Sequence, residues 1–480
     1  MVGDRESKGA FVRRIALFLI LLVTAGAARA QNESKLHADF RGEHERFGKS
    51  CPGFQLKALA GCGVFLFTDH PLHIAAGSIA PQNGFGTGIA FVAHFTPNET
   101  WRLSWNTDAV GSINGSWRAG AYMKAIYTPV KNEDTSHGRP KNPQDSVPSG
   151  PDTVFHLYAQ AISLNKLGFF GLGPATTVAA RSFFGMRETI LGTNALMPLS
   201  RLHMPKVSFV GEVNGRFFAI RGSHGQPSPS IEALYNSVTA PGLASQPGYL
   251  QLVEGLQIGP FSPSKYFQLD YLVKFQEFFA PGTTASSFRR LTADFSHQFP
   301  INGHPPSPSN GSQGPDDCTK KIDADPCPNI PKPHRAGFLE GSVGVRLFIS
   351  ESIIPAGHIL PFFLQPTLGG SDINGNGMLG SFQDYRFRAP NVLVLRGSFE
   401  HVIYGPLGFA FNVDEGKVAL TRGNIDFSHL AHSYAVGFTL RAGGFPQVFL
   451  LFAWGGHEGT HTTAQMNMSL LGAGGRPSLF

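Results

Sequence analysis

Apolar and polar residues alternate one by one along much of this chain. Between Tyr266 and Gln276, polar residues fall between apolar ones at positions 268, 270, 274 and 276. This period of two is typical of a β-strand with two different faces, and it cannot form one face of a helix. The apolar positions in this segment are Phe267, Leu269, Tyr271, Val273 and Phe275, and similar alternation is found near Trp101, Val207, Tyr434 and Met466.

About sixteen such segments predict an all-β fold, a single closed antiparallel transmembrane β-barrel. In such a barrel, strands of about ten residues turn apolar side chains to lipid and polar ones to the lumen. Closure removes the strand edges, whose backbone groups lipid cannot satisfy. The predicted strands begin near Thr87, Trp101, Ser116, Val154, Phe183, Lys206, Tyr249, Lys265, Phe288, Gly337, Leu360, Asn391, Leu407, Ser433, Gln447 and Thr463.

Loop lengths predict an orientation. If the first strand runs outward, connections after odd-numbered strands are extracellular and should be the long ones. The Pro-rich insertions Pro129–Asp152, after the third strand, and Ile301–His334, after the ninth, fit this rule. Ser223–Gly248, after the sixth strand, does not fit. Three interpretations stay open for it: a plug, a segment folded into the lumen, or an error in the strand count.

A soluble β-sandwich or propeller is the alternative fold, since its strands also alternate. There the apolar face packs against a second sheet. The sequence has no repeat at the period of about 40–50 residues that propeller blades show. The barrel is therefore favoured.

The N-terminus predicts export. Lys8, Arg13 and Arg14 precede an apolar run of about 13 residues, and Ala28-Arg29-Ala30 forms a small-x-small cleavage site. The run is too short for a permanent membrane helix, so a retained anchor is the weaker interpretation. We expect residues 1–30 to be a signal peptide, 31–80 a short periplasmic segment and 81–480 the barrel.

Composition supports strands that face lipid. Charged residues make up 15% of the chain, against about 25% in ordinary globular proteins, while Gly (57) and Phe (41) are abundant. The net charge is +6, but no Lys/Arg cluster is interleaved with stacking aromatics, so nucleic acid is not an expected partner. The expected partners are outer-membrane lipids and, during insertion, the barrel-assembly machinery.

The four cysteines form two close pairs in the sequence, Cys51 with Cys62 and Cys318 with Cys327. Export makes disulfides chemically possible, and we expect two local disulfides that each close a loop. A zinc site built from four such distant cysteines is the weaker alternative. No cofactor or metal is expected.

The region from residue 79 to 480 resembles the BamA/TamA family, the bacterial surface-antigen outer-membrane barrels. The resemblance rests mainly on Leu360-Pro361-Phe362-Phe363, Leu368-Gly369-Gly370, Arg386-Phe387-Arg388, Glu400 and Asp414-Glu415-Gly416. In that family a Pro-Phe-Phe strand leads to Leu-Gly-Gly and a long extracellular loop with a Leu-Arg-Gly-Tyr/Phe motif. The resemblance implies a membrane-assembly or transport protein.

Two departures separate the chain from the family pattern. The loop motif falls on Leu379-Gly380-Ser381-Phe382, so Gly380 stands where the family has its Arg. The family's assembly and secretion members also carry periplasmic POTRA domains of roughly 75 residues, and the segment between Gln31 and Pro81 is too short for one. Both departures favour the family's architecture over its best-known activity.

Parity also predicts which charges meet in the lumen. On the predicted strand from Asn391, Arg396 and Glu400 share the lumen face, and a three-residue turn places Arg396 opposite Asp414 and Glu400 opposite Ala410. In the family the loop Arg reaches acidic groups at these positions. Here Arg396, Arg386 or Arg388 must replace it, so we predict an Arg within salt-bridge distance of Asp414. The alternative is that these charges are simply solvated.

Catalytic motifs are weak. His457-Glu458-Gly459-Thr460-His461 has the spacing of a zinc-protease motif, but that motif needs a helix and this stretch is Gly-rich. A passive pore for small polar solutes and a hydrolase with a rim Ser/His pair remain alternative functions. Phe480 is either the terminal aromatic that the assembly machinery reads or a chance Phe.

Overall fold

The structure is a computed structural model that describes residues 72–98, 100–128, 153–199, 207–223, 225–264, 267–301, 341–404, 407–442, 445–456, 458–466 and 476–479. By contacts the chain divides into two compact units, Met1–His73 and Ile74–Phe480. The first unit lies almost wholly outside the described residues. The predicted signal peptide, most of the periplasmic segment and all four cysteines therefore stay untested.

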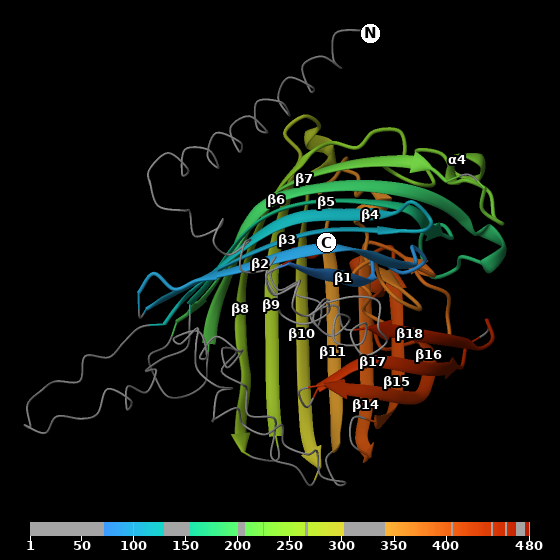
Figure 1. Cartoon of the computed structure of the whole chain (residues 1–480). Coiled ribbons are helices and arrows are strands. Elements are labelled where there is room, and N and C mark those ends of the chain that lie inside the picture. Colours follow the sequence, from blue (N-terminus) through green and yellow to red (C-terminus); the bar gives the residue numbers. More distant parts are fainter. Residues whose placement is uncertain are drawn as a thin grey trace, which may run out of the picture. The chain divides into compact units, whose positions relative to one another are not determined.

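Within the described residues, sixteen strands form one sheet in which every strand pairs with its neighbours in the chain (Figure 1). Each pairing with a described register is antiparallel. In order, the strands are β1 (Leu72–Ser78), β2 (Phe85–Phe95), β3 (Trp101–Ser112), β4 (Trp117–Tyr127), β5 (Thr153–Phe169), β6 (Ser182–Pro198), β7 (Val207–Gly222), β8 (Tyr249–Ser264), β9 (Phe267–Phe279), β10 (Phe288–Ile301), β11 (Gly341–Ile353), β14 (Asn391–Tyr404), β15 (Leu407–Ala419), β16 (Ala431–Ala442), β17 (Phe445–Trp454) and β18 (His461–Met466).

The strand count agrees with the sequence, but two assignments were wrong. No sheet strand begins at Leu360; that stretch holds the 3₁₀ turn η5 (Phe362–Leu364) and the two-residue strand β12 (Thr367–Leu368). The sheet instead begins with β1, inside the range predicted to be periplasmic. A short run of buried apolar residues has the same sequence pattern in a strand and in a packed turn. The strand predicted at Leu360 was wrong for this reason.

The corrected order changes which connections share an end of the sheet. The connections after β4 and β10 leave one end, and those after β7 and β11 leave the other, because consecutive antiparallel strands alternate. The sequence predicted that the Pro-rich insertions and the Leu-Gly-Gly loop share one end of the barrel. This prediction was wrong, because they leave opposite ends of the sheet. The misfit at Ser223–Gly248 is also resolved, since this connection, with helix α4 (Ile231–Leu234), lies at the same end as the Leu-Gly-Gly loop.

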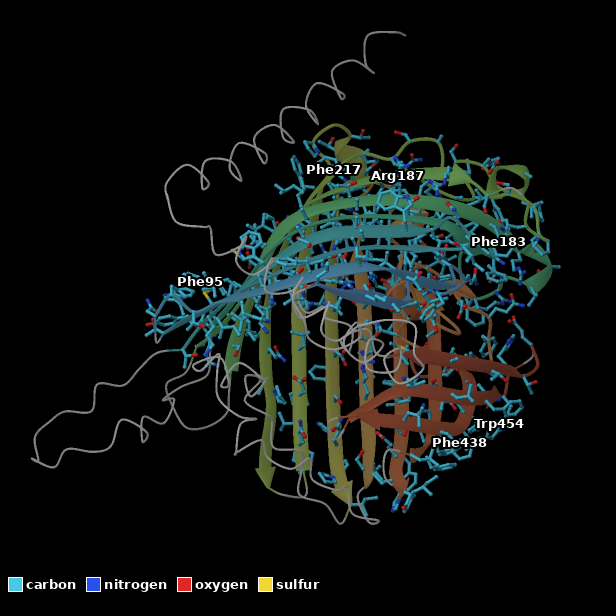
Figure 2. All side chains as sticks on the ribbon, viewed as in Figure 1. Phe95, Phe183, Arg187, Phe217, Phe438 and Trp454 are labelled. Carbon is cyan, nitrogen blue, oxygen red and sulfur yellow. The ribbon has the colours of Figure 1, made fainter. Side chains whose placement is uncertain are left out.

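The two faces of the sheet have opposite character. On β7, Val213 (46%) and Phe217 (48%) are exposed, whereas Asn214 and Arg216 are each 1% exposed. Phe438 and Trp454 are also exposed and, like Phe217, are labelled in Figure 2. Alternation thus puts apolar side chains outside and polar ones on the covered face, which is the reverse of a water-soluble sheet.

Apolar residues that are buried gather at one end of the covered face. Phe169, Phe184 and Phe218 come from the strands, and Phe362 and Phe363 come from the connection between β11 and β14. Phe362 packs edge-on against both Phe169 and Phe184, with ring centroids 5.0 Å apart in each pair. Among the described residues, none of the helices reaches the length and hydropathy that a membrane-spanning helix needs.

Candidate functional site

The connection between β11 and β14, residues 354–390, lies against the covered face of the sheet, and we call it the inner loop. It contains η5, β12 and the short strand β13 (Phe387–Arg388), which pairs with β12. Its contacts reach strands far apart in the sheet: Phe363 packs on Phe218 of β7, and Ser381 N–H donates to Ser433 Oγ of β16 over 2.9 Å. The inner loop therefore bridges the covered face.

Two glycines fold the inner loop back on itself. Gly369 and Gly370 both have positive φ, +101° and +59°. A Cβ on Gly370 would lie 2.5 Å from the Asp384 backbone nitrogen, and one on Gly369 would lie 2.6 Å from Arg386 Cβ. Only glycine fits such positions without a shift of the backbone. The predicted Leu-Gly-Gly motif thus serves close packing of the loop on its own second half.

Asp414 on β15 holds the tip of the inner loop. Its side chain is 4% exposed and accepts from Arg396 Nε over 2.6 Å and from Arg396 Nη2 over 2.8 Å. Its Oδ2 also accepts from the Leu379 backbone N–H over 2.8 Å, and Arg396 Nη2 donates to Gly377 O. One carboxylate and one guanidinium from neighbouring strands therefore bind two peptide groups of the loop.

The predicted register is the one observed, with Arg396 opposite Asp414 and Glu400 opposite Ala410. At the tip of the inner loop, Arg396 supplies a positive charge to Asp414 and Leu379 supplies a backbone donor. Gly380 itself approaches β17, because a Cβ there would lie 3.2 Å from Ala453 Cβ. Leu379 has φ +55°, a strained backbone conformation for this residue type. The hydrogen bond from the Leu379 N–H to Asp414 helps to stabilise that conformation.

Arg386 joins the inner loop to two other connections at the same end of the sheet. It donates to Thr176 Oγ1 over 2.7 Å and to Thr176 O over 2.6 Å, between β5 and β6. Its Nε forms an ion pair with Glu458, between β17 and β18, and its side chain is 4% exposed. The guanidinium also stacks over Phe387 and Phe170, 4.6 Å and 5.1 Å from the ring centroids.

The Glu458 ion pair also bears on the zinc-protease spacing. Gly455, Gly456 and Gly459 all have positive φ, which a helix does not allow. Glu458 is paired with Arg386, and His457 lies outside the described residues. Among the described residues, no group of three or more His, Cys, Asp or Glu side chains could hold a metal ion.

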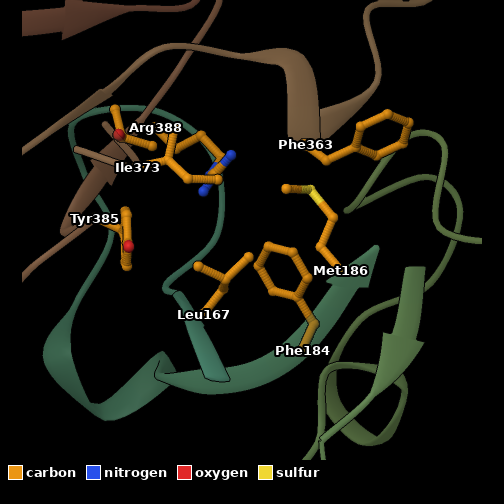
Figure 3. Close-up of a pocket in the computed structure, with 8 residues that line it drawn as sticks. Leu167, Phe184, Met186, Phe363, Ile373, Tyr385 and Arg388 are labelled. Carbon is orange, nitrogen blue, oxygen red and sulfur yellow. The ribbon is translucent and has the colours of Figure 1, made fainter. Parts of the chain in front are cut away.

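Arg388 lies deep in the apolar end of the covered face. It is 4% exposed and donates to the carbonyl oxygen of Phe362, the first residue of η5, over 2.8 Å. Phe169, Phe184 and Phe362 surround it, with ring centroids about 6 Å away. Arg388 also lines a small pocket (Figure 3). The other residues that line it are Leu167, Phe184, Met186, Phe363, Thr367, Ile373 and Tyr385.

Burial changes the titration of groups in the inner loop. It lowers the pKa of the Arg388 guanidinium to about 10, so this side chain is still a cation at neutral pH. It raises the pKa of the Asp384 carboxyl, although the Ser371 backbone N–H opposes the shift. The pKa of the Tyr385 phenol is raised well above its usual value for the same reason.

The structure brings most of the predicted site residues together. Phe382 packs edge-on against Phe387, and Gly416 leaves room for Leu368, whose Cδ2 lies 3.0 Å from where a Cβ would be. Glu400 is separate, because it lies four residues along β14 from Arg396, or about 13 Å. Sequence reasoning missed Thr176, Glu458 and Gly456 as partners of the loop, and only the order of connections along one rim could have indicated them.

Comparison with known proteins concerns the fold. No protein-family model matches the chain, and no curated protein matches it. In fold, the chain is similar to BamA and CdiB. CdiB from Acinetobacter baumannii is 11% identical with a TM-score of 0.42, covering 82% of this chain and 57% of that one.

Two further solved structures give similar figures. BamA from Haemophilus ducreyi lacking POTRA domains 1–3 is 8% identical with a TM-score of 0.43, covering 82% of this chain and 68% of that one. CdiB from Escherichia coli is 13% identical with a TM-score of 0.43, covering 82% and 62%. The match to the first of the three thus extends over little more than half of that protein.

The contact between Gly456 and Phe382 gives a test of loop packing. A Cβ on Gly456 would lie 2.4 Å from Phe382 Cζ, and Gly456 has φ +71°. Gly456→Val is therefore expected to displace Phe382 and to lower the unfolding temperature in detergent. Gly423→Val is the control, since its Cβ meets nothing within 4 Å and its φ is not positive. Equal unfolding temperatures for the two variants would contradict this packing.

Proposed function

We propose that this chain is a non-enzymatic integral β-barrel of the bacterial outer membrane, active in membrane assembly or transport. The observation that carries the proposal is the inverted character of the sheet. Side chains such as Phe217, Phe438 and Phe452 are 47–53% exposed, while Arg216, Glu188 and Asp414 are 0–2% exposed. An apolar outer surface over so many strands suits lipid and would aggregate in water.

Closure of the sheet is part of this proposal. The sheet ends in β1 and β18, and an unpaired strand edge in lipid leaves backbone N–H and C=O groups without partners. We propose that these edges meet in the membrane. An antiparallel sheet of sixteen strands in sequence order is suited to this, since it has an even number of strands.

The filled interior favours assembly or transport over a passive pore. A pore for small polar solutes needs a wide aqueous lumen. Here the inner loop is anchored at Asp414, Arg386 and Arg388, and its residues Phe362, Phe363 and Leu364 are each 0% exposed. The sequence resemblance to the BamA/TamA family supports the same choice, because that family also keeps its extracellular loop inside the barrel.

Connection lengths suggest which end faces the cell exterior. Between β8 and β9, β14 and β15, and β16 and β17, only two residues join the strands. Turns this short are typical of the periplasmic end. We therefore propose that the opposite end, with the inner loop and residues 420–430, faces outward, which puts the Pro-rich insertions after β4 and β10 on the periplasmic side despite their length. An epitope inserted after Gly423 should be detected on intact cells, and detection only after lysis would reverse the orientation.

Fractionation of cells provides the main test. The chain is expected in the outer-membrane fraction, with a gel mobility that changes when the sample is boiled. A soluble periplasmic protein without this mobility shift would refute the proposal. Bilayer conductance then separates the two functions: brief or rare openings fit a loop-filled barrel, and a steady channel of fixed size fits a passive pore.

A charge on the proposed lipid face should block insertion. Phe438 on β16 is 53% exposed, and Phe438→Arg is expected to cost about 2–4 kcal/mol in the membrane. The matched control is Asn412→Arg on β15, whose side chain shares the covered face with Asp414. Membrane-inserted protein, measured by the mobility shift, should fall for Phe438→Arg alone. Equal yields would argue that this face meets water.

A further inference from the structure

The segment Arg476–Leu479 lies against the covered face of the sheet, far in sequence from the residues it contacts. Arg476 forms an ion pair with Asp108 of β3. Ser478 O accepts from Arg216 Nη2 of β7 over 2.7 Å, and the Leu479 N–H donates to Asn374 Oδ1 of the inner loop over 2.8 Å. Leu479 is 6% exposed and packs in the same apolar cluster as Ile373.

The residues that receive this segment are themselves fixed. Asp108 is 8% exposed and also binds Arg118 Nη2 over 3.3 Å and the Tyr122 hydroxyl over 3.2 Å. The three nitrogens of Arg216 have different acceptors: Nε donates to Gln251 over 2.6 Å, Nη1 to Glu188 over 2.5 Å, and Nη2 to Ser478 O. The site thus presents the Asp108 carboxylate and an N–H donor of Arg216 to the segment. Both groups are buried and fixed in place by contacts with neighbouring side chains.

We propose that Asp108, Arg216 and Asn374 form an interior peptide-binding site, and that Arg476–Leu479 is its resident ligand. The class of ligand is an extended peptide with an arginine, a backbone carbonyl acceptor two residues later and a large apolar side chain after it. Bound there, the segment ties β3, β7 and the inner loop together and narrows the interior. This last role rests on the proposed barrel, whereas the binding itself does not.

A photo-crosslink tests the site in detergent, where membrane insertion plays no part. With benzoylphenylalanine in place of Leu479, ultraviolet light should join residue 479 to peptides from the inner loop, mapped by mass spectrometry. Adding Arg476→Ala should lower this crosslink about tenfold or more, because it leaves a buried carboxylate without that cation. Arg476→Lys should restore a large part of it.

Arg289→Ala is the matched control. The Arg289 side chain is 60% exposed and pairs with Glu277 on the exposed face of the sheet, whereas the segment's partners Asp108, Arg216 and Asn374 lie on the covered side. It should leave the crosslink unchanged. Crosslinks that avoid the inner loop, or a yield that Arg476→Ala does not change, would overturn the binding site. Failure of the proposed barrel would show instead in fractionation, with the crosslink intact.

Bilayer recordings test the narrowing role. Arg476→Ala, the change that lowers the crosslink, should release the segment and raise the mean conductance severalfold over the unsubstituted chain. The crosslink supports binding on its own, so an unchanged conductance in a variant that has lost the crosslink would overturn the narrowing role.

Discussion

Replacement of Asp414 by asparagine is expected to lower the free energy of unfolding by about 2–3 kcal/mol. The carboxylate is 4% exposed and accepts hydrogen bonds from Nε and Nη2 of Arg396 and from the Leu379 N–H. The amide keeps the shape but loses the charge, which leaves the Arg396 guanidinium without its carboxylate. Because the same group holds the loop tip, we also expect faster proteolysis within residues 370–385. Urea unfolding in detergent measures the first effect.

Asp426→Asn is the matched control for this change. Asp426 is also paired, with Lys417 Nζ at 2.6 Å, but its side chain is 54% exposed. The Lys417 ammonium lowers the pKa of the Asp426 carboxyl well below its usual value, yet solvent screens such a pair. Its replacement should leave unfolding unchanged. If the two variants unfolded alike, Asp414 would not be an anchor of the loop.

Replacement of Arg386 by leucine is the second large effect, about 3 kcal/mol of destabilisation. The change leaves Glu458, 10% exposed, beside a hydrocarbon side chain, and removes two hydrogen bonds to Thr176. Since Arg386 links three connections, we expect them to loosen together. Hydrogen exchange should rise in residues 170–181 and 455–460 as well as in the inner loop.

Arg289→Leu controls for loss of an arginine as such. The Arg289–Glu277 pair has a Nε–Oε1 distance of 2.8 Å, but the two side chains are 60% and 41% exposed. Little change in stability is expected from such a pair. Exchange that rises in the inner loop alone, and not in the other two connections, would show that Arg386 does not link them.

The proposals lead to a barrel whose interior is organised by arginines. Arg386, Arg388 and Arg396 act on the inner loop, while Arg216 acts on the segment Arg476–Leu479. Each donates to backbone carbonyls, which arginine can do in several directions at once because its guanidinium is a planar fork. This allows irregular backbone to be buried with its carbonyls satisfied.

Alternation along the chain was enough to predict most of the strands and their faces. A strand has a period of two, so each residue's parity decides its side of the sheet whatever the neighbouring strands do. The pairing of Arg396 with Asp414 was also predicted correctly, although two residues rather than the predicted three join the strands and a register shift between Val402 and Tyr404 makes up the difference. Most residues of the sequence motifs lie in or against the inner loop, but Glu400 lies apart from it.

The tertiary structure alone decided what the irregular segments do. Leu360–Leu364 and Leu72–Ser78 are both apolar and short, and only their packing shows that the first is a buried turn and the second a strand. The partners Thr176, Glu458, Asp108 and Asn374 are separated in sequence from Arg386 and from residues 476–479 by up to hundreds of positions. Local periodicity carries no information about such contacts, because they depend on how a sixteen-stranded sheet brings distant connections together.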